Sequence, residues 1–583
     1  MTFPTPEQQA YIEAPLSEHV YLRACPGSGK TEVVAAMIAK AAREWQLYPS
    51  GIAVLTFCNS ATDELKERLH EHLGDPLPHP HCVSTFDSFL LNHVVGNIAT
   101  QLTGYPGRDG DHRIRLIDRS SNIYLTRTRI YGRKISACKY DYDMEAKRFV
   151  FTTGELTDTK LNAVNQTREI IADLTETKRR FWRGGFATYR DIDMLALMAL
   201  RNAAYDDYFA KVVRRFPIAV VDECQDLSAE QLSIVRQLAR RGMKFHFVGD
   251  LHQSIYGFRK SDPARVRRLL DELDFNEYVL TTNWRSGQAI VDLCSDLLRV
   301  ARRAGNPGIE PLKPQLIQYQ QCPSELTQKI VELTHGYQNV VVVARGHGTL
   351  QRFNRGGKPD LAPVEELALS CVLIESRNLE EVRQALKLFA GWLASKLSLE
   401  ISPDSLSCPI EVESKLEWRQ FIFQCLKFLS SCGAASLELT WKEWAVLTKQ
   451  AIQTLPNQPF VPHSVAPLLV GLRDLNLSAP AGKGAEAFAE QLLQGRQQPI
   501  SSHRLATIHQ VKGESHDATV LLSSLKAGSQ GNWKDWLHDP LSEAARFAYV
   551  ASSRPRHLLI WGVKTLKPGE RVRMADLGFE IVD

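Results

Sequence analysis

The sequence predicts an α/β protein with two parallel sheets, each interrupted by an inserted subdomain. Short apolar runs rich in β-branched residues begin at positions 20, 52, 216 and 244 and alternate with segments of helical periodicity. That alternation is typical of a parallel sheet covered by helices on both faces. Similar runs at 278–282, 340–344, 519–522 and 558–561 predict a second sheet. A chain of 583 residues has room for about four domains.

Helices between the strands of the first sheet are indicated by local signals. A helix at 61–73 places Leu65, Leu69 and Leu73 four residues apart on one face. Another helix follows Ser228, and Gln231 three residues later completes a capping-box pattern. Both are expected to pack on this sheet.

Two long stretches interrupt the strand pattern. The second, residues 351–500, is expected to be helical, because apolar residues recur every three or four positions over 379–397, 416–429, 441–455 and 485–493. Residues 478–484 predict a flexible link. Apolar stripes of this kind are usually core, so we expect a small helical core here.

The first stretch, residues 91–205, interleaves basic and aromatic side chains. They are Arg113, Arg115, Arg119, Arg127, Arg129, Arg133, Lys134 and Lys139, with Tyr124, Tyr131 and Tyr140. Residues 122–131 alternate enough to predict a strand. This composition suits a nucleic-acid surface. A solvated strand face or a protein contact would explain it equally well.

Composition narrows the class of protein. A hydrophobic content of 44% with 23% charged residues is normal for a globular chain, and the net charge of +4 requires any nucleic-acid affinity to come from a local groove. The 11 cysteines include no Cys-x-x-Cys pair, which favours reduced thiols in the cytoplasm and argues against structural zinc. We find no apolar run of about 18 residues, so no membrane span is expected.

The residues after the first strand have the composition of a phosphate-binding loop. They are Ala24, Cys25, Pro26, Gly27, Ser28, Gly29, Lys30 and Thr31. Small residues let backbone N–H groups converge on phosphate oxygens, and a helix that begins near Lys30 adds its positive end. Lys30 would reach the β- and γ-phosphates of ATP, and Thr31 would bind Mg²⁺. For the loop alone, a glycine-rich turn without nucleotide is the alternative.

A pair of carboxylates follows the strand that begins at 216. Asp222 would hold Mg²⁺ through water, and Glu223 is placed to orient or deprotonate the attacking water. Open α/β sheets bind ligands at the carboxyl ends of their strands, so both half-sites are expected at one sheet edge. The expected cofactors are therefore ATP and Mg²⁺.

Further short motifs follow in order along the chain. They occupy residues 5–9, 54–61, 85–89, 222–226, 249–259, 280–286, 507–513 and 549–554. In this order they resemble the motif set of the UvrD/Rep/PcrA branch of superfamily 1 DNA helicases. The resemblance implies two RecA-like lobes, 1A and 2A, with a mixed or helical insertion 1B and a helical insertion 2B. It places lobe 1A at 1–90 and 206–275, 1B at 91–205, lobe 2A at 276–350 and 501–583, and 2B at 351–500.

The resemblance implies a role for each residue near the nucleotide. Gln8 matches the glutamine that reads the adenine edge, and Trp284 matches an aromatic that stacks on the base. Gln253 matches the residue that senses the γ-phosphate. Arg285 and Arg554 match two arginine fingers, which stabilise charge on the transferring phosphoryl group.

A separate set matches positions that touch single-stranded DNA in the family. It comprises Phe57, Thr85, Tyr256, Phe258, Arg259, Thr507 and His509. Stacking on aromatic side chains contributes about 1–3 kcal/mol per base and tolerates any sequence. These aromatics could also be ordinary core residues.

Three positions depart from the family pattern. The acidic residue of the fifth motif, Glu514, falls one position early, so either it still reaches the ribose or that contact is lost. Pro555 follows Arg554 and should end or kink any local helix. Cys25 is either a thiol whose alkylation blocks ATP or a small buried filler.

The resemblance implies an ATP-dependent helicase that moves 3′ to 5′ on single-stranded DNA and unwinds duplex. Expected partners are single-stranded DNA, single-strand/duplex junctions and a separate nuclease or repair protein. Residues 512–516 are also similar to the fifth motif of compact anti-phage helicases such as the Gabija subunit. A DNA-gated ATPase that regulates a larger assembly is the alternative. A phosphate-loop kinase would leave the paired arginines unexplained.

Overall fold

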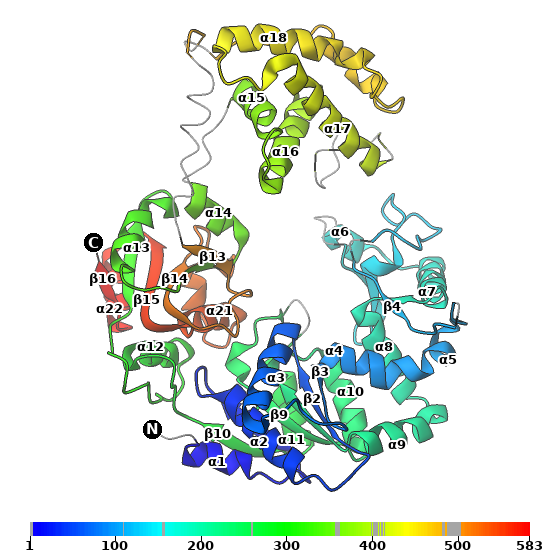
Figure 1. Cartoon of the computed structure of the whole chain (residues 1–583), viewed down its shortest axis with the longest axis vertical. Helices are drawn as coiled ribbons and strands as arrows, with labels where there is room; N and C mark the ends of the chain where they lie inside the picture. The colour runs from blue at the N-terminus through cyan, green and yellow to red at the C-terminus, as the bar shows by residue number, and fades with distance from the viewer. Residues whose placement is uncertain are drawn as a thin grey trace. The chain divides into compact units, whose positions relative to one another are not determined.

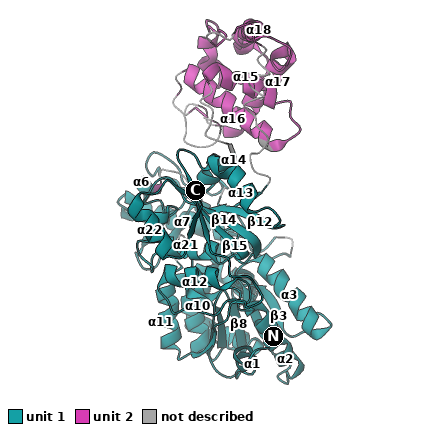
Figure 2. Ribbon diagram, turned by 90° about the vertical axis from the view of Figure 1, so that its left-hand side faces the viewer, with its two compact units in different colours: residues 1–153, 159–356, 501–583 teal, residues 154–158, 357–500 magenta. Residues whose placement is uncertain are grey.

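The computed structural model describes residues 4–582 apart from 109, 120, 154–157, 258–260, 356–361, 398, 400–405, 407, 410, 411, 413, 481–483 and 487–502. The chain forms two compact units (Figure 2). The first contains Met1–Thr153, Thr159–Gly356 and Ser501–Asp583, and the second contains Gly154–Asp158 and Gly357–Ile500. The first unit holds two parallel sheets, which are the two RecA-like lobes (Figure 1). No described helix is long and apolar enough to cross a membrane.

In the described chain the first sheet has six parallel strands in the order β10, β1, β9, β8, β2, β3. They are β1 (Val20–Ala24), β2 (Ile52–Thr56), β3 (Cys82–Thr85), β8 (Ile218–Asp222), β9 (Lys244–Gly249) and β10 (Asn276–Leu280). Every residue of β2 and β8 is buried, because both faces of the sheet are covered. This two-sided burial explains why the strands appear in the sequence as continuous apolar runs.

Helices pack on both faces of the first sheet. They include α1 (Pro6–Ile12), α2 (Lys30–Arg43), α3 (Asn59–Leu73), α10 (Ala229–Arg240) and α11 (Pro263–Glu272). Alternate strand residues enter separate cores: Leu22 packs with α1, α2 and α3, whereas Tyr21 belongs to the cluster that holds α10 and α11. The predicted capping box of α10 is confirmed, with Gln231 N donating to Ser228 Oγ over 3.1 Å.

The strand at 276–280 corrects one expectation. The sequence pattern grouped residues 278–282 with the second sheet, but β10 pairs in parallel with β1 of the first, with Val20 opposite Asn276. An apolar run indicates a strand without naming its neighbour, and the exposed Asn276 and Glu277 are typical of an edge. The chain therefore enters the second lobe only after β10.

The second sheet also has six parallel strands in the described residues, in the order β13, β12, β14, β15, β11, β16. They are β11 (Gln315–Tyr319), β12 (Val340–Ala344), β13 (Arg504–Thr507), β14 (His516–Leu522), β15 (Pro555–Lys564) and β16 (Glu580–Val582). Helices α12 (Gln288–Leu298) and α21 (Glu543–Ser552) share a core with this sheet. As expected, helix α21 ends before Pro555, which opens β15.

The first insertion is a mixed structure. It holds an antiparallel hairpin of β5 (Tyr140–Asp143) and β6 (Arg148–Phe151), followed by helices α7 (Arg168–Arg183) and α8 (Tyr189–Leu200). The strand predicted at 122–131 is wrong. Only single bridges occur there, Leu125 to Ser136 and Ile130 to Arg133, and Tyr124 and Tyr131 both have positive φ. Turns of this kind break the pleat that an alternating pattern assumes.

The second unit is helical, as predicted. Its helices include α15 (Pro363–Leu373), α16 (Leu379–Lys396), α17 (Lys415–Leu429) and α18 (Trp441–Thr454). Their apolar stripes meet in a core that buries Trp392, Trp418, Trp441 and Trp444. Most of the helix expected at 485–493 lies outside the described residues. The stripes are therefore core rather than partner surface.

Candidate functional site

The strand order brings three loops of the first sheet together. β9 lies between β1 and β8, so the segment after β9 runs between the loop after β1 and the carboxylates that end β8. This segment contains η6 (Leu251–Gln253). Since all three strands are parallel, their carboxyl ends share one edge, where ligands bind in such sheets.

The loop after β1 has a conformation that requires glycine. Gly27 and Gly29 have φ of +71° and +78°. A Cβ on Gly27 would lie 2.5 Å from both Arg285 Cβ and Asn283 Oδ1, so no side chain fits there. Trp284 N donates to Gly27 O over 2.8 Å. The phosphate-binding loop is thus packed against the segment that follows β10.

Lys30 lies between the two predicted catalytic carboxylates. Its Nζ is 2.9 Å from Asp222 Oδ1 and also donates to Glu223. Although burial opposes the charged form, the two carboxylates raise the pKa of Lys30. Burial alone would raise the pKa of Glu223, but Lys30 lowers it to about 2. Glu223 is therefore ionised, and Lys30 is held as an ammonium between the two carboxylates.

These residues open into a polar cleft with a volume of about 590 Å³. Residues from both lobes line it, including Cys25, Gly27, Lys30, Thr31, Asp222, Glu223, Gln253, Trp284, Arg285, Gly513 and Arg554. The volume lies in the range of small-molecule sites, about 300–1,000 Å³. Nearly the whole predicted nucleotide set thus faces a single cleft.

The two predicted arginine fingers place positive charge in this cleft. Arg285 Nη1 donates to Ser553 O over 3.1 Å. Burial, together with the nearby guanidinium groups of Arg554 and Arg556, lowers the pKa of Arg285 to about 9. A guanidinium remains charged at neutral pH, so both side chains could pair with an anion.

Gln253 makes three hydrogen bonds, and two of them connect it to the other lobe. Its Oε1 accepts from Arg554 Nη2 over 3.0 Å, its Nε2 donates to Asp250 over 3.2 Å, and its carbonyl accepts from Lys512 Nζ over 2.9 Å. Lys512 Nζ is also 2.5 Å from the buried carboxylate of Asp226. Lys512 and Asp226 belong to quoted motifs, but the sequence alone assigned them no role.

One face of α21 adds three further contacts to the segment after β9. Glu543 Oε1 accepts from Gly257 N over 2.8 Å, and Arg546 Nε donates to Ser254 O over 2.7 Å. Tyr549 OH donates to Asp250 Oδ2 over 2.8 Å. We call residues 543, 546 and 549 the α21 clasp. Their three-residue spacing on a helix was the available signal, because it places them on adjacent turns of one face.

Three of the predicted DNA-facing residues lie together. The rings of Phe57 and Tyr256 stack with centroids 4.9 Å apart, and His509 lies 5.6 Å from Tyr256. Lys512 Nζ is 5.0 Å from the centre of the Tyr256 ring. Lys512 therefore contacts both the aromatic group and Gln253 of the polar cleft.

The other predicted DNA-facing residues are placed differently. Thr85 caps helix α4 (Phe86–Phe89) by accepting from Ser88 N over 3.1 Å. Thr507 is buried and donates to Gln510 over 3.1 Å. Phe258 and Arg259 lie outside the described residues.

Two predicted nucleotide contacts are engaged elsewhere. Gln8 donates to Ser28 O over 3.2 Å and accepts from Thr5 N over 2.8 Å, so it braces the phosphate loop. Glu514 makes two 2.8 Å bonds to Arg504 and a third of 2.9 Å to His516, and it is not among the residues lining the cleft.

Cys25 is buried, and burial raises the pKa of its thiol to about 11, which favours the filler role. A thiol with so high a pKa is protonated at neutral pH, whereas the reactive form is the thiolate. All 11 cysteines lie in described residues and are free thiols.

Comparison with known proteins identifies relatives of the chain. Residues 4–274 match the family described as UvrD/REP helicase N-terminal domain. The chain is 26% identical over 285 residues to the ATP-dependent DNA helicase PcrA of Leuconostoc citreum, which covers 47% of this chain and 36% of that protein. It is 27% identical over 298 residues to the ATP-dependent DNA helicase UvrD1 of Mycobacterium leprae (strain TN), covering 48% and 37%.

A yeast protein is similar over a comparable length. The ATP-dependent DNA helicase srs2 of Schizosaccharomyces pombe is 23% identical over 332 residues, covering 53% of this chain and 36% of that protein. The chain thus spans little more than a third of the length of these curated relatives. None of the three names points to anti-phage defence, so that expectation gains no support.

Proposed function

Because this chain carries a UvrD/REP helicase N-terminal domain and is a distant homologue of superfamily 1A DNA helicases, we propose that it is an ATP-driven motor on single-stranded DNA. It moves 3′ to 5′ and separates duplex ahead of it. The observation that supports this most directly is Lys512, which contacts Gln253 of the ATP cleft and Tyr256 of the aromatic group. A contact shared by two binding sites allows a ligand at one site to change the affinity of the other site.

The cleft suits ATP with Mg²⁺. Thr31 and Asp222 offer the oxygen donors that Mg²⁺ prefers, and the nucleotide phosphates would complete its coordination. In the described chain no group of three or more His, Cys, Asp or Glu side chains could hold a metal ion. The ion would neutralise phosphate charge. Lys30 would break its ion pairs with Asp222 and Glu223 and would itself bind the β- and γ-phosphates.

Chain residues supply the remaining steps of hydrolysis. Glu223, held ionised by Lys30, orients and deprotonates the attacking water. Arg285 and Arg554 stabilise charge on the transferring phosphoryl group. Since Arg554 also donates to Gln253 Oε1, loss of the γ-phosphate changes the surroundings of Gln253 directly.

Motion follows from alternating grip. The segment after β9 is held by the α21 clasp and carries Tyr256, so a change in how the lobes meet at Gln253 alters the aromatic group that stacks on bases. A motor requires only that its open and closed states differ in DNA affinity. Arg127 and Arg129 of the first insertion are exposed, and we propose that they contact the phosphates of a single-strand/duplex junction.

Steady-state ATP hydrolysis with and without single-stranded DNA tests this function, with Lys30→Ala as the blank. Strong stimulation that disappears in the variant is expected, followed by displacement of a strand from a duplex with a 3′ tail and not a 5′ tail. Stimulated hydrolysis without displacement would favour a DNA-gated regulatory ATPase. Hydrolysis that ignores DNA would refute the motor.

A further inference from the structure

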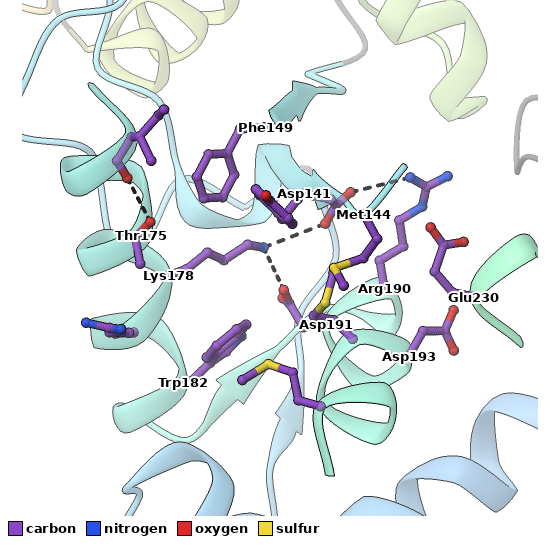
Figure 3. Close-up of a pocket in the computed structure, with 15 residues that line it drawn as sticks. Asp141, Met144, Phe149, Thr175, Lys178, Trp182, Arg190, Asp191, Asp193 and Glu230 are labelled. Atoms are coloured by element: carbon purple, nitrogen blue, oxygen red, sulfur yellow. Dashed lines mark hydrogen bonds and ion pairs between the residues drawn. The ribbon is translucent and has the colours of Figure 1, made fainter. Parts of the chain in front are cut away.

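A second cavity lies in the first insertion, formed by different residues from those of the ATP cleft. It has a volume of about 360 Å³ and lies between the β5–β6 hairpin, α7 and α8, with Glu230 of α10 at one side (Figure 3). We call it the insertion pocket. The proposed motor assigns it no role, although its volume suits a large side chain or a small ligand.

The polar floor of the insertion pocket is built around a buried lysine. Lys178 Nζ is 2.8 Å from Asp191 Oδ1 and 3.7 Å from Asp141 Oδ1 (Figure 3). It also donates to Ala137 O over 2.8 Å. The charge of Lys178 is therefore balanced within the protein. Asp141 Oδ2 is in turn 3.8 Å from Arg190 Nη1, so the acidic groups of the floor are also paired within the protein.

The walls and mouth of the pocket are apolar and adaptable. Three of the seven methionines of the chain line it: Met144, Met194 and Met198. Methionine fills irregular gaps and is frequent at surfaces that accept varied partners. Met198 and Ile171, at the mouth, are 48% and 39% exposed. Exposed apolar residues gathered around a hollow indicate an interaction site more than isolated ones do.

Charge distinguishes one end of the pocket. Asp193 is buried, and Glu230 lies beside it (Figure 3). Burial, reinforced by the charges of Asp87 and Glu230, raises the pKa of Asp193 well above its ordinary value, although Gln231 and Arg190 act in the opposite direction. Arg190 also lines the pocket beside these two carboxyl groups, so this end carries one guanidinium against two acidic groups, and a further cation would stabilise their ionised forms (Figure 3). This end of the pocket therefore complements a basic group.

We propose that the insertion pocket docks a partner protein through a segment in which a large apolar side chain is flanked by Lys or Arg. The apolar side chain fills the methionine-lined hollow, and the basic group reaches Asp193 and Glu230. A motor anchored in this way would be recruited by a partner without use of its ATP cleft.

Binding of defined peptides to the full chain tests the proposal. One set of seven-residue peptides combines Phe, Leu or Trp with Lys and Arg, and a matched set carries Glu in place of each basic residue. Methionine methyl groups labelled with ¹³C report contact, and fluorescence anisotropy reports affinity. We expect the basic set to bind at least tenfold more tightly and to shift the methyl signals of Met144, Met194 and Met198.

Variants separate docking from folding. Met198→Lys and Ile171→Lys should each weaken the best basic peptide at least tenfold, and Glu230→Gln at least threefold, with ATP hydrolysis unchanged. Val331→Lys, at a similarly exposed position on α13 (Thr327–Leu333), is the matched control and should bind normally. Equal binding of both peptide sets, or binding that ignores Met198→Lys, would overturn the proposal. So would shifts of the three methyl signals by single-stranded DNA or by a small apolar amine when no peptide binds.

Discussion

The backbone N–H of Gly257 donates to Oε1 of Glu543 over 2.8 Å, which joins the segment that carries Tyr256 to helix α21 of the other lobe. A Cβ on Gly257 would lie 2.6 Å from the same carboxylate oxygen, so a larger residue would require the Glu543 side chain to shift. The contact is the outermost of the α21 clasp. This hydrogen bond lies between the aromatic group and the lobe that carries Arg554. Removing it therefore tests whether DNA binding is coupled to ATP hydrolysis.

Glu543→Gln should lower DNA-stimulated ATP hydrolysis several-fold and leave basal hydrolysis near normal. A hydrogen bond to a charged group contributes about 1.5–3 kcal/mol, and the amide retains only part of it. The measurement is the ratio of stimulated to basal turnover. Glu570→Gln, in the first turn of α22 (Pro568–Asp576), is the control. Equal loss of both rates would mean that Glu543 acts only on folding.

Gly27→Ala should abolish ATP hydrolysis. The alanine Cβ would lie 2.5 Å from Arg285 Cβ at a residue with φ of +71°, so the phosphate loop and the arginine segment could not keep their contact. Gly74→Ala is the control, because Gly74 has φ of +79° and no atom within 4 Å of the added carbon. That control should lose about 1–2 kcal/mol of stability from backbone strain and keep its activity. Normal turnover by Gly27→Ala would contradict the close packing of the two segments.

Phe57→Ala should weaken binding of single-stranded DNA about 5- to 150-fold, which corresponds to the roughly 1–3 kcal/mol of one stacked base. Basal hydrolysis should remain, since Phe57 does not line the ATP cleft. Anisotropy with labelled oligonucleotides measures the affinity. Phe57→Trp, which keeps a ring face, should restore binding. If tryptophan fails as alanine does, Phe57 supports Tyr256 rather than contacting bases.

Stability should depend on pH through Asp226. Burial raises the pKa of this carboxyl from 3.8 to about 6, although Lys512 opposes the shift. The folded chain then holds the proton more tightly than the unfolded chain, so the free energy of unfolding falls as pH rises from about 4 to about 6. Compared with Asp226→Asn, the wild-type chain should lose about 3 kcal/mol across this window. Denaturant unfolding at both ends measures the difference, and parallel curves would contradict the shift.

Sequence patterns were sufficient where local chemistry decides the structure. The glycines around Lys30, the apolar runs before Asp222 and the capping box at Ser228 each carry their own physical signal. Contacts between segments that are far apart in the chain are not indicated by any local sequence pattern. The pairing of β10 with β1, the turns at Tyr124 and Tyr131, and the bonds of Glu514 to Arg504 and His516 depend on which surfaces meet after folding.

The position of Lys30 has a consequence for how ATP responds to salt. Its ammonium is already neutralised by Asp222 and Glu223, so an arriving nucleotide exchanges one set of ion pairs for another within a largely buried space. Few mobile counter-ions need to leave. DNA, by contrast, sheds its condensed cations when a protein neutralises its phosphates. If the proposed function holds, raising ionic strength should release single-stranded DNA at a lower salt concentration than ATP.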